Sequence, residues 1–188
     1  MRFIRTAIPD VVIIEPALMG DERGYFVETF RQDKLNAFLG FTINFVQDNE
    51  SKSSYGVLRG LHYQLAPAAQ TKLVRVIKGK VLDVAVDIRA GSPSFGQHVS
   101  VELSEQNKRQ LLVPRGFAHA FVVLEDDTVF AYKVDNYYSP ENDRGIAFDD
   151  PALGIDWLVT KDRLKLSAKD TTQVLLNRAE VFDDGRLY

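Results

Sequence analysis

The fold is decided by the stretch Thr71-Lys72-Leu73-Val74-Arg75-Val76-Ile77-Lys78-Gly79-Lys80-Val81-Leu82-Asp83-Val84-Ala85-Val86-Asp87-Ile88. Polar and apolar residues alternate in residues 71–77 and again in 81–88, which is the period of a β-strand with one face in a core. Lys78-Gly79-Lys80 is typical of a tight turn, so the stretch predicts a β-hairpin. Asp83 and Asp87 are four residues apart and are therefore expected on the same face of the second strand.

The same pattern recurs on both sides of this stretch. Further strands are predicted over residues 11–15, 25–30, 99–103, 110–113, 118–124 and 128–134, and the last two are predicted to pair as a hairpin through 125–127. One short helix is predicted from Asp33, with Gly40 as its C-terminal stop. Many short strands joined by Gly and Asp turns favour an antiparallel sandwich or barrel.

Composition limits the kind of protein. A chain of 188 residues with 45% hydrophobic content fits one domain, 1–188, in which residues 135–188 form a lid and tail packed on the barrel. A net charge of −3 gives no general basic surface for nucleic acid. The chain has no Cys, which excludes disulfides and thiolate chemistry. No signal peptide or membrane-spanning apolar run is recognisable, so a cytoplasmic protein with no membrane partner is expected.

Residues 56–64, Gly56-Val57-Leu58-Arg59-Gly60-Leu61-His62-Tyr63-Gln64, place a cation, a proton-transfer group and an amide within one short strand. Gly60 lies between Arg59 and His62, where the absence of a side chain lets another group approach closely. By itself this stretch also fits a half-buried strand with a surface Arg and a hydrogen-bonded structural His.

A second motif sharpens the interpretation. Pro114-x-Gly116-x-x-His119 resembles the second motif of the cupins, which are small antiparallel jelly-roll barrels with a ligand cavity, and the strand of His62 takes the place of the first. Metal-binding cupins carry His-x-His and then an acidic ligand, but this chain has His62-Tyr63-Gln64 and, further on, Lys72. Two imidazoles beside an ammonium group make a poor divalent site, so no metal and no cofactor are predicted.

The pattern resembles one cupin family closely, the dTDP-4-dehydrorhamnose 3,5-epimerases. The resemblance runs in order from about residue 10 to residue 170. Besides residues 56–64, it is carried by Asp21-x-Arg23-Gly24-x-Phe26-x-Glu28, Phe45-Val46-Gln47-Asp48-Asn49, Asp83-Val84-Ala85-Val86-Asp87-Ile88-Arg89, Pro114-x-Gly116-Phe117-Ala118-His119, Tyr132-Lys133, Tyr138-Ser139-Pro140, Ile155-Asp156-Trp157 and Leu166-Ser167-x-Lys169-Asp170. Glu50 and Leu158 depart from the family pattern, where His and Pro are common. The resemblance implies an all-β, cupin-type jelly roll with a short N-terminal helix and a mixed C-terminal tail.

The resemblance also implies metal-free inversion of two carbons beside a ketone, on a dTDP-4-keto-6-deoxy sugar, in dTDP-L-rhamnose biosynthesis. Such a reaction needs a base on one face of the sugar, an acid on the other, and a donor or cation near the enolate oxygen. The family positions assign the base to His62, its carboxylate partner to Asp170, the acid to Tyr132 and the enolate contact to Lys72. Judged without the family, Tyr132 is an ordinary core aromatic, Asp170 a solvated carboxylate and Lys72 a surface Lys.

The nucleotide end of the substrate requires cations and hydrogen-bonding groups, because it carries a diphosphate. The resemblance implies a set of substrate-binding residues: Arg23, Phe26, Glu28, Gln47, Asp48, Asn49, Arg59, Lys72, His119, Tyr138, Asp143 and Lys169. Within this set Tyr138 is expected to stack on thymine, Asp143 stands where the family commonly has Glu, and Asp83 is expected to orient His119. His98 is expected to be structural or at the surface.

A homodimer is implied as well, in which the segment holding Arg23, Phe26 and Glu28 crosses to a second subunit. Three alternatives stay open at this stage. One is an epimerase that inverts C3 or C5 only, and another is a non-catalytic cupin that binds a nucleotide sugar. The third is a metal-dependent cupin oxygenase or isomerase, for which the ligand set is short.

Overall fold

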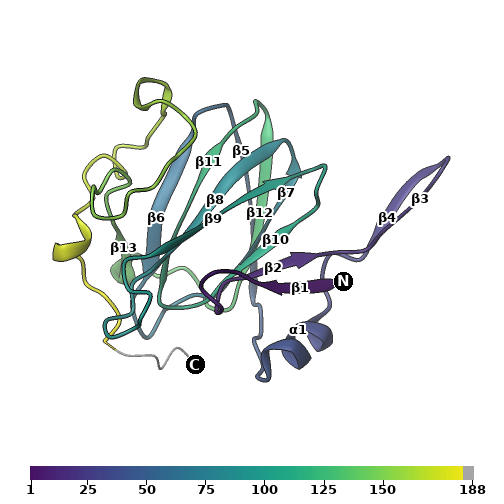
Figure 1. Cartoon of the computed structure of the whole chain (residues 1–188), viewed down its shortest axis with the longest axis horizontal. Helices are drawn as coiled ribbons and strands as arrows, with labels where there is room; N and C mark the ends of the chain where they lie inside the picture. Colours follow the sequence, from purple (N-terminus) through teal and green to yellow (C-terminus); the bar gives the residue numbers. More distant parts are fainter. Residues whose placement is uncertain (184–188) are drawn as a thin grey trace.

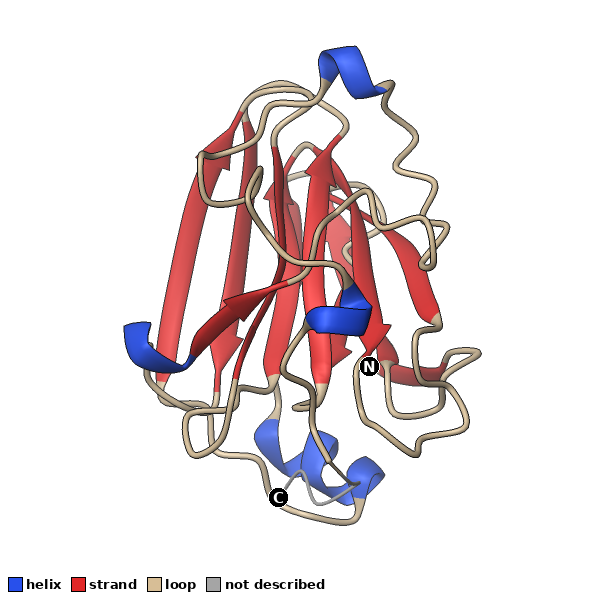
Figure 2. Ribbon diagram, turned by 90° about the vertical axis from the view of Figure 1, so that its left-hand side faces the viewer, coloured by secondary structure: helices blue, strands red, loops and turns tan. Residues whose placement is uncertain are grey.

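Two antiparallel sheets face each other in the computed structural model of the protein, which describes residues 1–183 (Figures 1 and 2). The six-stranded sheet has the order β1 (Arg2–Arg5), β2 (Val12–Glu15), β10 (Gln110–Val113), β7 (Lys72–Lys78), β12 (Thr128–Val134) and β5 (Gln47–Ser53). The five-stranded sheet has the order β13 (Asp143–Gly145), β6 (Leu58–Gln64), β11 (Phe117–Val123), β8 (Lys80–Asp87) and β9 (His98–Ser104). The predicted all-β jelly roll is confirmed.

The predicted hairpins through residues 78–80 and 125–127 are wrong. β7 pairs with β10 and β12, whereas β8 pairs with β9 and β11 in the facing sheet, so each turn carries the chain from one sheet to the other. The two corners pack together: Gly79 has φ +80, a Cβ there would lie 3.0 Å from Cα of Thr128, and Lys80 N–H donates to Oγ1 of Thr128 at 3.2 Å. A tight turn between two alternating segments has the same sequence pattern in a hairpin within one sheet and in a corner between two sheets, so the pattern alone does not distinguish them.

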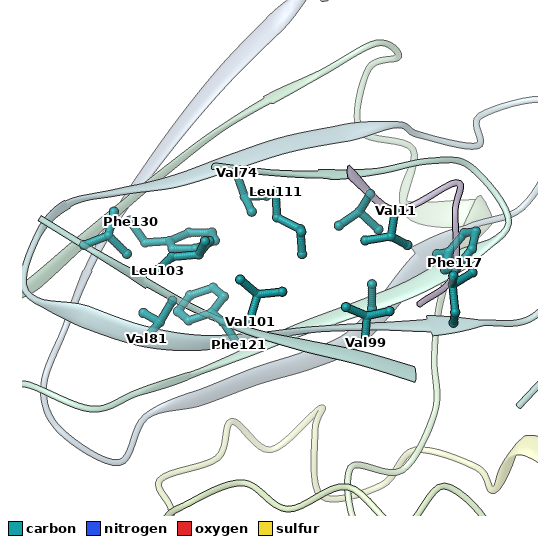
Figure 3. Close-up of a cluster of buried hydrophobic side chains, with 14 of the residues drawn as sticks. Val11, Val74, Val81, Val99, Val101, Leu103, Leu111, Phe117, Phe121 and Phe130 are labelled. Carbon is teal, nitrogen blue, oxygen red and sulfur yellow. The ribbon is translucent and has the colours of Figure 1, made fainter. Parts of the chain in front are cut away.

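The main core fills the space between the sheets. Phe130 of β12 and Phe121 of β11 stack with ring centroids 4.0 Å apart, which joins the sheets beside the corners. Each fully buried side chain of this size stabilises the fold by about 1.5–3 kcal/mol. Figure 3 shows the side chains of both sheets pointing toward one another, among them Val74, Leu111 and Phe130 from the six-stranded sheet and Val81, Val101 and Phe121 from the five-stranded sheet.

Each sheet is also covered on its outer face. Helix α1 (Gln32–Leu39) packs Leu35 against the six-stranded sheet and ends at Gly40, whose φ of +82 and N–H bond to Asn36 O confirm the predicted helix and its stop. The segment after β13 covers the five-stranded sheet with Trp157, whose Nε1 donates to Phe148 O at 3.0 Å. One short 3₁₀ turn precedes β13 at Pro140–Asn142, and two more lie in the covering segment at Lys161–Arg163 and Leu176–Arg178. Residues 184–188, which belong to the predicted tail, lie outside the described residues.

One hairpin, β3 (Leu18–Asp21) with β4 (Gly24–Val27), extends away from both sheets (Figure 1). β4 ends at Val27, so residues 28–30 of the strand predicted over 25–30 are not part of it. β1, β3, β5 and β13 were not predicted. Apolar side chains of the hairpin are open to solvent in the single chain, with Met19 57% and Phe26 65% exposed. None of the helices in residues 1–183 is long and apolar enough to span a membrane.

Candidate active site

A pocket of about 550 Å³ opens between the two sheets. It combines polar and apolar side chains from both sheets with a short piece of the C-terminal segment. The lining residues are Asn49, Glu50, Ser51, Val57, Leu58, Arg59, His62, Lys72, His119, Phe121, Phe130, Tyr132, Lys165, Leu166, Ser167 and Asp170.

His62 and Asp170 meet in this pocket although 108 residues separate them in the chain. Nε2 of His62 lies 2.6 Å from Oδ1 of Asp170, whose side chain is only 3% exposed. Burial by itself raises the pKa of Asp170, but hydrogen bonds from His62 and Ser167 outweigh it and keep that pKa below its usual value. An ionised carboxylate only accepts, so Nε2–H of His62 donates and Nδ1 is the ring nitrogen that can take up a proton.

A second imidazole–carboxylate pair lies beside the first. Nε2 of His119 lies 2.9 Å and 3.0 Å from the two carboxylate oxygens of Asp83, which is completely buried. Burial raises the pKa of Asp83, and the neighbouring His119 opposes this. Because β11 also pairs with β6, His119 stands directly opposite His62 in the register.

A β-bulge at Gly60 turns Arg59 and His62 toward the same pocket. Strict alternation would send residues three apart to opposite faces, but residues 60 and 61 together face the single residue Ala120, between the pairs His62–His119 and Arg59–Phe121. Gly60 has φ +128, and a Cβ there would lie 2.6 Å from Cα of Ala120. The close approach predicted at Gly60 is therefore confirmed, and only glycine meets it.

Lys72 and Tyr132 enter the pocket from the six-stranded sheet. Nζ of Lys72 donates to the carbonyl oxygen of His62 at 3.2 Å, which ties the two sheets together beside the pocket. Burial lowers the pKa of Lys72 to about 8, against the opposing charges of Asp143 and Asp83. Burial also raises the pKa of Tyr132, so its hydroxyl keeps its proton at neutral pH.

Three other predicted residues form a cluster outside the lining of the pocket. The hydroxyl of Tyr138 donates to Oδ2 of Asp143 at 3.1 Å, and the ammonium group of Lys169 pairs with the same oxygen. The charges of Asp143 and Lys169 both act on Lys72, so the cluster lies within electrostatic reach of the pocket. Tyr138 is 59% exposed and offers a free aromatic face.

The remaining predicted residues divide into two groups. On β5, Asn49 lines the pocket and accepts from Gln47 Nε2 at 2.9 Å, while Asp48 pairs with Lys133 beside a second, smaller pocket. The other group, Arg23, Phe26 and Glu28, lies on or just after the projecting hairpin and does not line the pocket of its own chain. Arg23 pairs with Asp21, and Glu28 pairs with Arg31 and Lys34.

Several lining residues were not predicted. Ser167 donates its hydroxyl to Oδ2 of Asp170 at 2.7 Å, and a Ser three residues before an Asp is a local signal that could have indicated this contact. Glu50, Ser51 and Lys165 carry no such signal, because their positions depend on how β5 and the C-terminal segment pack. Within residues 1–183, no group of three or more His, Asp or Glu side chains is placed to hold a metal ion.

Comparisons with known proteins agree with this arrangement. The family model described as dTDP-4-dehydrorhamnose 3,5-epimerase matches residues 5–178. A dTDP-4-dehydrorhamnose 3,5-epimerase of Shigella flexneri is 56% identical over 159 residues, covering 85% of this chain and 88% of that protein. Another, of Salmonella typhimurium, is 52% identical over 179 residues, covering 95% and 97%.

A solved structure extends the similarity to the whole fold. It is the crystal structure of a dTDP-6-deoxy-D-glucose-3,5-epimerase of Legionella pneumophila in complex with dTDP-4-keto-L-rhamnose. It superposes with a TM-score of 0.94 at 49% sequence identity, and the match covers 98% of each chain. Family model, sequence relatives and fold agree over nearly the full length, so this chain belongs to the dTDP-4-dehydrorhamnose 3,5-epimerase family.

Proposed function

We propose that this protein is an isomerase that converts dTDP-4-dehydro-6-deoxy-D-glucose to dTDP-4-dehydro-L-rhamnose by inverting C3 and C5. One observation carries the proposal: His62 of β6 and Tyr132 of β12 line the same pocket from two facing sheets. A sugar ring held between the sheets presents one face to the imidazole and the other to the phenol. Inversion requires this arrangement, because the proton must leave from one face and return to the other.

His62 acts as the base in this proposal. A proton on a carbon next to the C4 ketone is transferred to Nδ1 of His62, and the electron pair moves into the carbonyl to form an enolate. Asp170 accepts the hydrogen bond from Nε2, holds the ring in the required tautomer and stabilises the imidazolium that forms. The same step operates at C3 and at C5, since both carbons flank the ketone.

The enolate oxygen needs a positive group or a strong donor at short range. Lys72 supplies an ammonium group to the pocket, and its burial strengthens its interaction with a developing negative charge. His119, held by Asp83 through Nε2, is a second donor from the neighbouring strand when its ring is protonated, because Nδ1 then also carries a hydrogen. Tyr132 then delivers its proton to the carbon from the opposite side, and its raised pKa means that it holds that proton when the enolate forms.

The diphosphate and the base bind toward the edge of the site in this proposal. Arg59 supplies a guanidinium group at the pocket, while Lys169 and the exposed ring of Tyr138 extend the surface beyond it. Gln47, Asp48 and Asn49 offer hydrogen-bonding groups along β5, and Asp143 orders Tyr138 and Lys169.

A homodimer completes the proposed site. The hairpin that carries Arg23 and Phe26 extends from the body of its own chain with an apolar surface open to solvent (Figure 1). Burial of that surface against a second copy would bring the Arg23 guanidinium and the Phe26 ring to the partner's pocket, and Glu28 follows at the base of the hairpin.

Solvent deuterium incorporation tests the function directly. The protein is incubated in D₂O with dTDP-4-dehydro-6-deoxy-D-glucose, and the sugar carbons are analysed by NMR beside a His62→Asn variant. Deuterium at both C3 and C5, absent with the variant, is the expected result. Deuterium at one carbon only would identify a single-site epimerase, and tight binding without any exchange would identify a non-catalytic binding protein.

A further inference from the structure

The C-terminal segment that delivers Asp170 to His62 is held by two separate devices. The first is a backbone clip, in which Lys165 N–H donates to Gly56 O at 2.8 Å and Leu58 N–H donates to Lys165 O at 3.0 Å. Gly56 permits this contact, because a Cβ there would collide with the carbonyl of Arg163. The clip aligns the segment with the start of β6, the strand that carries His62.

The second device is the side chain of Ser167. Its hydroxyl donates to Oδ2 of Asp170 at 2.7 Å, and its oxygen accepts from Asp170 N–H at 3.2 Å. The same N–H also reaches the carbonyl oxygen of Ser167 at 3.0 Å, which closes a tight turn over residues 167–170. The turn therefore forms from its backbone, and the hydroxyl adds a bond that acts on the carboxylate alone.

A carboxylate on a short side chain can rotate, and only one orientation points an oxygen at the base. In this structure Oδ1 of Asp170 faces Nε2 of His62 while Oδ2 is occupied by Ser167, so the two bonds together fix the plane of the group. Ser167 itself is exposed at the pocket rim, whereas Asp170 is buried. A sugar nucleotide in the pocket would exclude water from this bond and strengthen it.

We infer that Ser167 is a positioning residue of the reaction, which holds the Asp170 carboxylate in the orientation that aligns and stabilises the His62 imidazole. The residue acts through Asp170 and requires no contact with substrate. The lowered pKa of Asp170 agrees with this, since the bonds from Ser167 are among its causes. This inference rests on the proposed function, because it assigns a role within the same proton transfer.

The test compares Ser167→Ala with Ser167→Thr and with Thr171→Val. The Ala variant removes the hydroxyl and is expected to lower kcat by about tenfold, the lower end of the range for a hydrogen bond to a charged group. KM and the dissociation constant of dTDP are expected to stay within about twofold of the unchanged protein, since that much is within the scatter of surface substitutions. The Thr variant keeps the hydroxyl and should recover most of kcat, while Thr171→Val changes a hydroxyl of the same turn that donates to Ala168 O and should have no effect.

A double-mutant cycle separates positioning through Asp170 from a direct contact between Ser167 and the substrate. In an Asp170→Ala background there is no carboxylate to orient, so adding Ser167→Ala should change kcat by less than about twofold. An equal loss in both backgrounds, a parallel loss of dTDP affinity, or an unchanged kcat in the single variant would each overturn the inference. Circular dichroism and thermal melting confirm that each variant folds.

The solvent deuterium assay described above distinguishes a failure of this inference from a failure of the proposed function. If the unchanged protein incorporates deuterium and Ser167→Ala matches it, the inference fails and the proposed function stands. If the unchanged protein incorporates none, both are overturned.

Discussion

His62 and His119 stand directly opposite each other on β6 and β11, and each is bonded through Nε2 to a different carboxylate. Their surroundings differ. The side chain of His62 is 29% exposed at the pocket, whereas that of His119 is 7% exposed and pairs with the completely buried Asp83. The more accessible imidazole is placed to exchange protons with a ligand, and the enclosed one is placed to donate a fixed hydrogen bond.

This difference predicts unequal effects of the same substitution. His62→Asn removes the proposed base and is expected to lower kcat by about 10³-fold or more, with loss of deuterium exchange. His119→Asn keeps a donor of similar size and is expected to cost about 10–100-fold, partly through KM. Steady-state kinetics of the two variants are the measurement. Equal losses would contradict the division of roles.

Tyr132→Phe should separate proton removal from inversion. The variant keeps His62 and Lys72, so the enolate still forms and the base can return a solvent deuteron to the face it came from. We expect deuterium in the recovered starting sugar with little epimerised product, followed by NMR over time. Inversion at an undiminished rate would show that the proton comes from another group.

Lys72→Met is expected to abolish activity and stabilise the fold. Burial lowers the pKa of Lys72 to about 8, so below that pH the folded protein holds an unfavourably placed charge. Because the folded pKa lies below the unfolded value, the folded state binds fewer protons between about 8 and 10.5, and the unchanged protein gains stability as pH rises through that window. The variant should be more stable by about 2–3 kcal/mol at pH 7, with the difference closing toward pH 10.5.

Urea denaturation at several pH values measures this difference. Lys78→Met is the matched control, because Lys78 is the exposed last residue of the same strand. If Lys72→Met stabilises the protein equally at every pH, the cause is better packing of Met and not removal of the buried ammonium charge.

Asp143→Asn should move the alkaline limit of activity. Burial is the main influence on Lys72, and the charge of Asp143 is the largest of the groups that raise its pKa again. Removing that charge lowers the pKa of Lys72, so the ammonium group is lost and kcat/KM falls at a lower pH than in the unchanged protein. The pH profile of kcat/KM is the measurement. Asp149→Asn, which breaks an exposed pair with Lys161, should leave the profile where it was.

Most strands were predictable because each strand of the sandwich turns one face to the core, which gives a two-residue period of apolar side chains. β8 illustrates the limit, because its period did not indicate which face is the inner one. Asp83 lies on the inner face with Val81 and Ala85, and the outer residues between them are also apolar because the C-terminal segment covers them. Pairing was not predictable at the two corners, since a turn such as Gly79 does not reveal whether the next strand continues in the same sheet.

The site residues could be predicted only from the resemblance to a family, because residues distant in the chain are brought together by tertiary contacts. No local property of Asp170 indicates a partner 108 residues away, and the clip at Lys165 that holds its segment against β6 is a tertiary contact. Alternation also misplaces Arg59 relative to His62, because one bulge reverses the parity of the strand. Ser167 belongs to the motif Leu166-Ser167-x-Lys169-Asp170, but no role was predicted for it. An exposed Ser hydroxyl is as often bonded to water as to a neighbouring side chain, so the sequence alone does not reveal its bond to Asp170.

The projecting hairpin gives the last prediction. If Arg23 serves the pocket of a second copy, then Arg23→Ala and His62→Asn impair different chains of the same site. Each homodimer should be inactive or nearly so, because both of its sites contain the defect. When the two variants are unfolded and refolded together in equal amounts, half of the dimers are mixed. In each mixed dimer one site receives Arg23 from one chain and His62 from the other, so activity should recover to about a quarter of that of the unchanged protein.

Refolding each variant alone is the control. Light scattering checks that the products are dimers, and a mixture that stays inactive while dimeric would show that Arg23 acts within its own chain or not at all.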